Sequence, residues 1–254
     1  MTFAVGLSLA LAKPQVASPD QVSGTYRSGW RVVEGLTFAP DGRFRWSRRF
    51  CVAVERSQGS WKMDGDRVVL DPDSPAGAPG PSRRFLPIKW GERRYLIEEN
   101  RMPGFAADAR SPRNQSDDFY GDYYFAMEGK DHRVGKVSGA PMLPDWCKEF
   151  YELGAIEATV VKINPDRTVV LDRGTNGRLR PGLPLATWDD MDAEVVSVTE
   201  TTAVARLWYF ADSTLGPSVG DIFTTGSEAV APHPRDEKRY PYLVDVPHRP
   251  ATGH

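Results

Sequence analysis

The feature that most constrains this chain is an alternation of apolar and polar residues at period two, interrupted by turn residues. RFRWS (43–47) alternates in this way and follows the turn PDG (40–42). GSWKM (59–63) and RVVL (67–70) alternate on either side of an Asp-Gly turn, which is a strong hairpin signal because Gly tolerates positive φ. We therefore expect residues 23–105 to form an antiparallel β-meander or barrel.

A second region, residues 155–226, has a similar pattern of short apolar runs separated by Asn, Asp, Pro and Gly. Six short strands within about 70 residues are typical of a small β-barrel. The expected strands are Ala158–Ile163, Thr168–Leu171, Leu183–Trp188, Ala193–Thr199, Ala203–Tyr209 and Asp221–Thr224.

The segment between these regions, residues 106–154, is expected to be an irregular connector. Pro144 and Asp145 favour the start of one short helix over 146–151, and 119–127 can supply one more strand. Residues 227–254 are rich in Pro, His and charge and are expected to be a tail. The predicted fold class is mainly β, with two small antiparallel β-barrel or meander domains joined by this connector.

Composition places the chain among ordinary globular proteins, with 40% hydrophobic and 26% charged residues in 254. The net charge of -2 is unevenly distributed. Residues 21–105 carry about five excess positive charges and residues 106–254 about seven excess negative charges. The positive excess is small and interleaved with acidic residues, so we expect no nucleic-acid partner.

The first residues suggest export. Residues 2–12 form an apolar run of the length of a signal-peptide core, ending in Ala-Leu-Ala before Lys13, and this run is too short to span a bilayer. It lacks the usual basic residues ahead of the apolar core, and the alternative is a buried first strand. We interpret residues 1–22 as a signal-like segment and leader, and expect a periplasmic or secreted protein with no transmembrane segment.

Two cysteines, Cys51 and Cys147, fit an oxidising compartment if they form a disulfide. Closing so long a loop stabilises a fold by about 4 to 5 kcal/mol in the chain-entropy model. The alternative is two separate buried thiols that act as small hydrophobic side chains.

Two stretches resemble known groups of proteins. GTYRSGW, LTFAPDGRFRW and GSWKMDGDRVVL, within residues 24–70, resemble the lipocalin-like N-terminal halves of uncharacterised secreted bacterial proteins. EATVVKI, TVVLDRGTNGRLRPGLPLAT, AEVVSVTETTAVARL and VGDIFTT, within residues 157–225, are similar to small β-barrels of bacterial cell-envelope scaffold proteins and of flagellar assembly accessory proteins. The first resemblance implies a barrel-like fold without a fixed activity, and the second implies protein contacts rather than chemistry.

No common catalytic or nucleotide-binding motif occurs, so we expect a protein that is not an enzyme and needs no cofactor. Of the four histidines, only His132 precedes the tail, and no metal-ligand spacing emerges, so no metal site is expected. The acidic run over 189–194 offers oxygen ligands but lacks the Gly and spacing of a calcium loop, which favours a solvated turn.

Two candidate surfaces remain in the N-terminal region. Arg43, Arg45, Arg48 and Arg49 surround Trp46, and their guanidinium groups can bind carboxylate or phosphate if they face outward. An ordinary solvated strand face is the alternative. The other candidate is the barrel lining, which would consist of Tyr26, Phe38, Phe44, Trp46 and Trp61.

These observations lead to two functional hypotheses. The first is a non-catalytic interaction or scaffold protein of the bacterial cell envelope, whose partner is another envelope protein. The alternative is a lipocalin-like carrier, in which a hollow N-terminal barrel holds a small apolar ligand.

Overall fold

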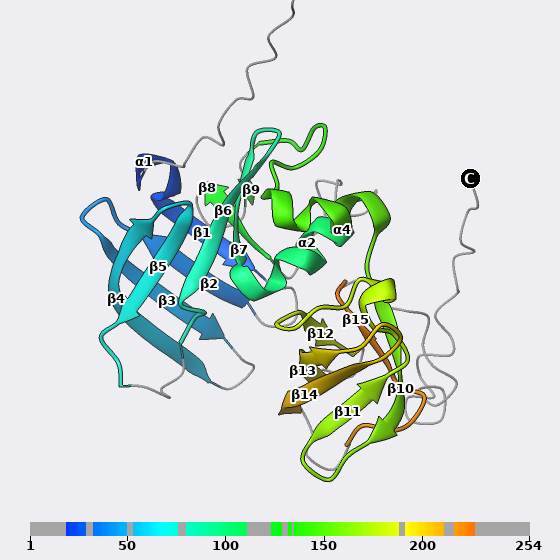
Figure 1. The fold of residues 1–254 in the computed structure, drawn as a ribbon. Helices are drawn as coiled ribbons and strands as arrows, with labels where there is room; N and C mark the ends of the chain where they lie inside the picture. Colours follow the sequence, from blue (N-terminus) through cyan, green and yellow to red (C-terminus); the bar gives the residue numbers. More distant parts are fainter. Residues whose placement is uncertain are drawn as a thin grey trace, which may run out of the picture.

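The computed structural model describes residues 19–28, 33–49, 53–75, 80–110, 123–128, 132–133, 135–187, 191–210 and 216–226. These residues are mainly β and form two closed antiparallel barrels, of eight and six strands, that lie beside each other with short helices between them (Figure 1). The predicted fold class is confirmed.

The first barrel is an up-and-down meander in which each strand pairs with the next along the chain. Pairing of β1 with β8 closes it, and β9 (His132–Arg133) extends the sheet beyond β8. The barrel strands are β1 (Gly24–Ser28), β2 (Val33–Phe38), β3 (Arg43–Arg49), β4 (Val54–Asp64), β5 (Arg67–Pro72), β6 (Arg84–Trp90), β7 (Arg93–Glu98) and β8 (Tyr124–Glu128).

Alternation in the sequence sets the two faces of these strands. Along β3, Phe44 and Trp46 are buried, whereas Arg43 and Arg45 are exposed. Successive side chains of a strand point to opposite faces, so the aromatic residues enter the barrel and the arginines point to solvent. The expected orientation of these four residues is confirmed.

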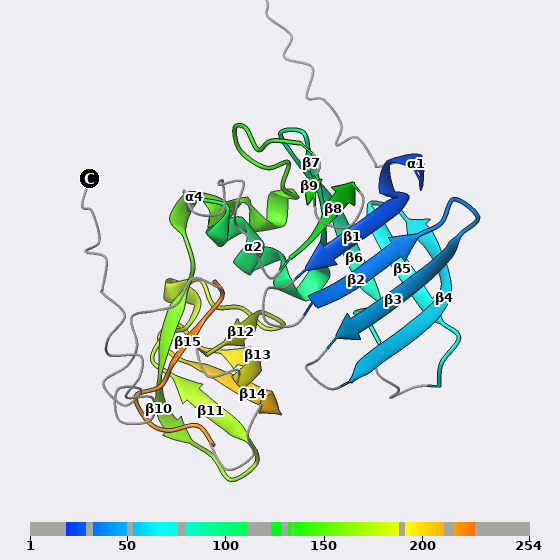
Figure 2. The ribbon, with the colours of Figure 1, turned by 180° about the vertical axis from the view of Figure 1, so that it is seen from behind.

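The second barrel has a different strand order, β10-β11-β14-β13-β12-β15, closed by pairing of β15 with β10 (Figure 2). Its six strands coincide closely with the six expected from sequence. They are β10 (Glu157–Ile163), β11 (Thr168–Leu171), β12 (Pro184–Ala186), β13 (Met191–Val198), β14 (Ala203–Phe210) and β15 (Ile222–Thr224).

The segment around residue 105 differs from the expectation of an irregular chain. A 3-10 turn, η1 (Glu99–Arg101), leads into helix α2 (Met102–Asp108), whose residues are all buried. Pro103 lies in the first turn of α2, where Pro is tolerated because its missing N–H is not needed. A helix that is almost entirely apolar is typical of a buried position. The buried carboxylate of Asp108, the last residue of α2, accepts a hydrogen bond of 2.6 Å from the Tyr123 hydroxyl.

The connector also contributes to the first barrel. Strand β8, which closes that barrel, lies within residues 106–154, so the barrel extends beyond residue 105. The one expected helix is present as the 3-10 turn η2 (Asp145–Cys147) followed by α4 (Lys148–Leu153). The remaining short elements are α1 (Pro19–Val22) and η3 (Thr175–Gly177).

The buried apolar side chains form two clusters. One fills the first barrel. The other is continuous from the outward side of β6–β8, through α2 and α4, into the second barrel. Strand β7 shows the division directly, because Leu96 belongs to the first cluster while its neighbours Tyr95 and Ile97 belong to the second. Strands β6–β8 are therefore covered on both faces.

Several expectations concern residues outside the described part of the chain. These are the signal-like segment, Cys51, the tail over 227–254, and Asp189 and Asp190 of the acidic run. Among the described residues, no helix has the length and apolar character needed to cross a membrane.

Candidate functional site

A cavity of about 630 Å³ lies where the first barrel, η1, α2, η2 and the loop before β12 meet. Four of its thirteen lining residues are arginines, Arg67, Arg83, Arg84 and Arg180, and Glu99 is the acidic one. Three of these arginines come from the starts of β5 and β6, and Arg180 comes from the second barrel. The volume is within the range of pockets that hold small ligands or short segments of other chains.

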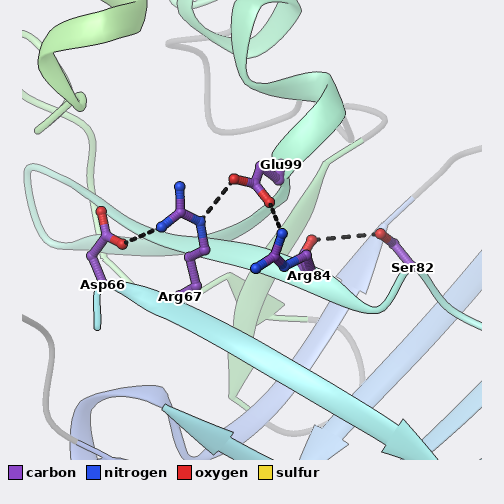
Figure 3. Close-up of polar contacts among 5 residues, drawn as sticks. All are labelled: Asp66, Arg67, Ser82, Arg84 and Glu99. Atoms are coloured by element: carbon purple, nitrogen blue, oxygen red, sulfur yellow. Dashed lines mark hydrogen bonds and ion pairs between the residues drawn. The ribbon is translucent and has the colours of Figure 1, made fainter. Parts of the chain in front are cut away.

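The Glu99 carboxylate bridges two of these arginines (Figure 3). Its Oε1 accepts a hydrogen bond of 2.7 Å from Arg67 Nε, and its Oε2 lies 3.6 Å from Arg84 Nη1. Arg67 Nη1 also lies 3.3 Å from Asp66 Oδ1. The hydrogen bond and negative charge of Glu99 raise the pKa of Arg67, so this side chain stays cationic.

Arg180 is positioned by the connector. It forms an ion pair with Glu149 of α4, and its Nη2 donates a hydrogen bond of 3.1 Å to the Trp146 carbonyl oxygen. Its guanidinium carbon lies 5.2 Å from the centroid of the Phe150 ring, within the range of a cation–π contact. The second barrel therefore presents a fixed positive charge to the cavity.

The cavity also has an apolar side. Trp146, which is 42% exposed, lines it together with Leu183 and three prolines, Pro103, Pro181 and Pro184. Arg83 is exposed at the cavity, and among the described residues its side chain has no counterion within ion-pair distance. The arrangement combines guanidinium groups with an apolar wall, which suits an anionic group attached to an apolar stem.

The arginines singled out from sequence lie elsewhere, along β3. Arg43, Arg45 and Arg49 are exposed, and Arg43 Nη2 lies 2.6 Å from Asp73 Oδ2. Arg48 is half-buried and lies two positions after Trp46, so its side chain points to the inward face of β3. It therefore does not share the surface of Arg43, Arg45 and Arg49. Its Nε lies 3.1 Å from Glu34 Oε1.

Arg48 instead belongs to a polar cluster at one end of the first barrel. The Tyr124 hydroxyl donates a hydrogen bond to Glu34 Oε2 and accepts one of 3.1 Å from Trp46 Nε1. Burial and the nearby Glu34 carboxylate raise the pKa of Tyr124, which keeps the hydroxyl protonated. Burial likewise raises the pKa of Glu98.

The five aromatic residues expected to line a hollow barrel pack on one another. All lie in the cluster that fills the first barrel, and all are at most 7% exposed. The ring centroids of Phe38 and Trp61 are 5.2 Å apart, and those of Tyr26 and Phe38 are 5.9 Å apart, both edge to face. Such packing does not favour an apolar ligand at these side chains.

Cys147 is a buried free thiol at the start of α4, which is the alternative that the sequence left open for it. Its Sγ lies 3.3 Å from the Pro144 carbonyl oxygen, and burial raises its pKa to about 12. A thiol held neutral in this way is a poor nucleophile. Its expected disulfide partner, Cys51, is outside the described residues.

In the part of the chain that the structure describes, no group of three or more His, Cys, Asp or Glu side chains could hold a metal ion. Of the acidic run, Asp192 is half-buried and Glu194 exposed on β13.

Sequence reasoning missed the cavity because its arginines are far apart in the chain. Arg67 and Arg180 are separated by more than 100 positions and belong to different barrels. The adjacent Arg83 and Arg84, directly after a Pro-rich loop, were the one local signal. Their meeting with Arg180 depends on the packing of α2 and α4, which no local pattern encodes.

Comparison with known proteins adds little. No family model and no curated protein matches the chain. A similar solved structure is that of the Cpx pathway activator NlpE from Escherichia coli, with 10% sequence identity. The match covers 74% of this chain and 96% of that chain, with a TM-score of 0.23. At so low a TM-score, we draw no conclusion from it about fold or function.

Proposed function

We propose that this is a non-catalytic interaction or scaffold protein of the bacterial cell envelope, and that the arginine-lined cavity between its barrels is the contact site. The observation that carries the proposal is the convergence of Arg67, Arg83, Arg84 and Arg180, from two barrels, on one cavity. A partner that enters it touches both barrels at once. Placement in the envelope rests on the signal-like residues 2–12.

The packing of the described residues favours a binding surface over a ligand chamber or a reactive thiol. The side chains expected to line a ligand chamber fill the first barrel, and the buried cysteine thiol is held neutral. Arg83, at the cavity, has no ion-pair partner among the described residues, which leaves a cation available to another charged surface.

Site-directed photo-crosslinking in the bacterium that encodes the protein tests this function. A photo-crosslinking amino acid at Asn100, an exposed residue of the cavity, should give an adduct with a protein identified by mass spectrometry as an envelope component. The same amino acid at Lys62, exposed on β4 away from the cavity, is the matched control and should give none. Absence of an adduct at Asn100, or recovery of the protein from the cytoplasm alone, would contradict the proposal.

A further inference from the structure

The chemistry of the cavity restricts what its occupant can be. Glu99 serves as counterion to two guanidinium groups at once, Arg67 at 2.7 Å and Arg84 at 3.6 Å. A single carboxylate therefore already occupies the position between these two arginines (Figure 3). This part of the cavity therefore accommodates a carboxylate group.

The charges around the cavity are not fully balanced by the described residues. Three of the four arginines pair with three carboxylates, those of Asp66, Glu99 and Glu149. Arg83 is the surplus cation, exposed and with no ion-pair partner in the described ranges. An incoming anion can therefore pair with Arg83 without displacing another group of the described residues.

The apolar wall distinguishes between two kinds of anion. Phosphate-binding sites are commonly built from several backbone N–H groups that point at the phosphate oxygens. Three of the residues on this wall are prolines, Pro103, Pro181 and Pro184, which have no N–H to donate. Trp146, which is 42% exposed, instead offers a surface for the methylene groups of a side chain that ends in a carboxylate.

Resting on the function proposed above, we propose that the cavity binds an acidic segment of the partner protein through its Glu or Asp carboxylates. Arg83 captures one carboxylate. A second carboxylate of the segment exchanges with Glu99 for the guanidinium groups of Arg67 and Arg84, while its aliphatic stem packs on Trp146. Glu99 is thus an internal competitor that weakens binding of the segment.

Binding of a fluorescein-labelled hexaglutamate peptide to the full-length protein, followed by fluorescence anisotropy at low ionic strength, tests this assignment. Arg83→Glu should weaken binding by about tenfold or more, because a charge-assisted contact is replaced by repulsion. Arg45→Glu is the matched control, since Arg45 is exposed on β3 away from the cavity, and should change the affinity by less than about twofold. Glu99→Gln should tighten binding by about two- to fivefold.

Four outcomes would overturn the assignment. They are failure of the wild-type protein to bind the peptide, an equal loss for Arg83→Glu and Arg45→Glu, no gain for Glu99→Gln, and tighter binding of inorganic phosphate or of phosphatidylglycerol vesicles than of the peptide. Circular dichroism should show unchanged folding of each variant, and Arg83→Gln, which only removes the charge, should give a smaller loss in the same direction.

The photo-crosslinking experiment separates this inference from the proposed function. If the Asn100 adduct with the envelope protein forms equally well in the Arg83→Glu variant, the interaction role stands and the acidic-segment assignment fails. If no adduct forms in the wild type, the proposed function itself fails, whatever the peptide binds.

Discussion

The two barrels close in the same way, by antiparallel pairing of a late strand with an early one, but they complete their cores differently. The first barrel is filled by large aromatic side chains that contact one another and form a cluster of their own. The second is lined by smaller residues such as Ala158, Ala193 and Ala205, and its core continues into α2, α4 and the outward side of β6–β8. The core of the first barrel is thus formed mainly by its own strands, whereas the core of the second barrel is completed by the helices of the connector.

This difference explains where the cavity lies. A barrel whose core continues into neighbouring helices must be packed against them, and the loop that carries Arg180 is brought beside the first barrel by that packing. The connector therefore determines both the stability of the second barrel and the geometry of the candidate site. Four substitutions test the packing of the two barrels and of the helix between them, from the largest expected effect to the smallest.

Phe150→Ala should reduce the free energy of unfolding by about 3–5 kcal/mol, because it removes a fully buried ring of α4 from the shared core. Denaturant unfolding measures the loss of free energy of unfolding, and hydrogen exchange shows which elements are destabilised. Exchange should accelerate in α4 and in the second barrel. Phe44→Ala, in the first barrel, is the matched control and should accelerate exchange in β1–β5 instead. Unchanged exchange in the second barrel of Phe150→Ala would refute its dependence on the connector.

Tyr124→Phe should reduce the free energy of unfolding by about 1–3 kcal/mol, since Trp46 Nε1 and Glu34 lose their buried hydrogen-bond partner inside the first barrel. Thermal or chemical denaturation measures the loss. Tyr151→Phe, at a half-buried ring on α4, is the control and should change stability by less than about 0.5 kcal/mol. Equal effects of the two substitutions would show that the polar cluster does not stabilise the first barrel.

Gly104→Ala should destabilise the protein by about 1–3 kcal/mol. An alanine Cβ at this position of α2 would lie 2.4 Å from the Thr225 carbonyl oxygen, just beyond β15. The sign is diagnostic, because Gly to Ala within a helix otherwise stabilises by about 0.5–1 kcal/mol. Gly216→Ala, where a Cβ would meet open space, should be nearly neutral. A Gly104→Ala protein as stable as the wild type would show that α2 is not tightly packed on the second barrel.

Glu98→Gln should have the smallest effect, and one that depends on pH. Burial raises the pKa of Glu98 above its ordinary value of 4.5, with Arg101 and Arg48 opposing the shift and Glu34 and Asp192 adding to it. The folded state thus holds this proton more tightly than the unfolded state, so the ionised carboxylate is destabilising. The penalty is absent below about pH 4.5 and develops as pH rises from there to the raised pKa of the folded state.

Unfolding measured between pH 4 and pH 8 should therefore show the Glu98→Gln variant more stable than the wild type at neutral pH, with the difference disappearing in acid. A constant difference across this range would mean that Glu98 does not titrate as its burial requires.

The sequence by itself determined the β class, the six strands of the second barrel and the inward aromatic face of β3, because alternation and turn residues are local properties of the chain. Other features depended on contacts between distant segments. Closure of the first barrel by β8, burial of the apolar helix α2, and the meeting of Arg67 and Arg84 with Arg180 were decided only by the tertiary structure. The runs FLPI in β6 and YFAM in β8 are apolar at consecutive positions, a local sign of strands covered on both faces that we did not use, and they do not say what covers them. A local pattern states which side of a strand is apolar, whereas the partner that covers it is selected by packing over the whole molecule.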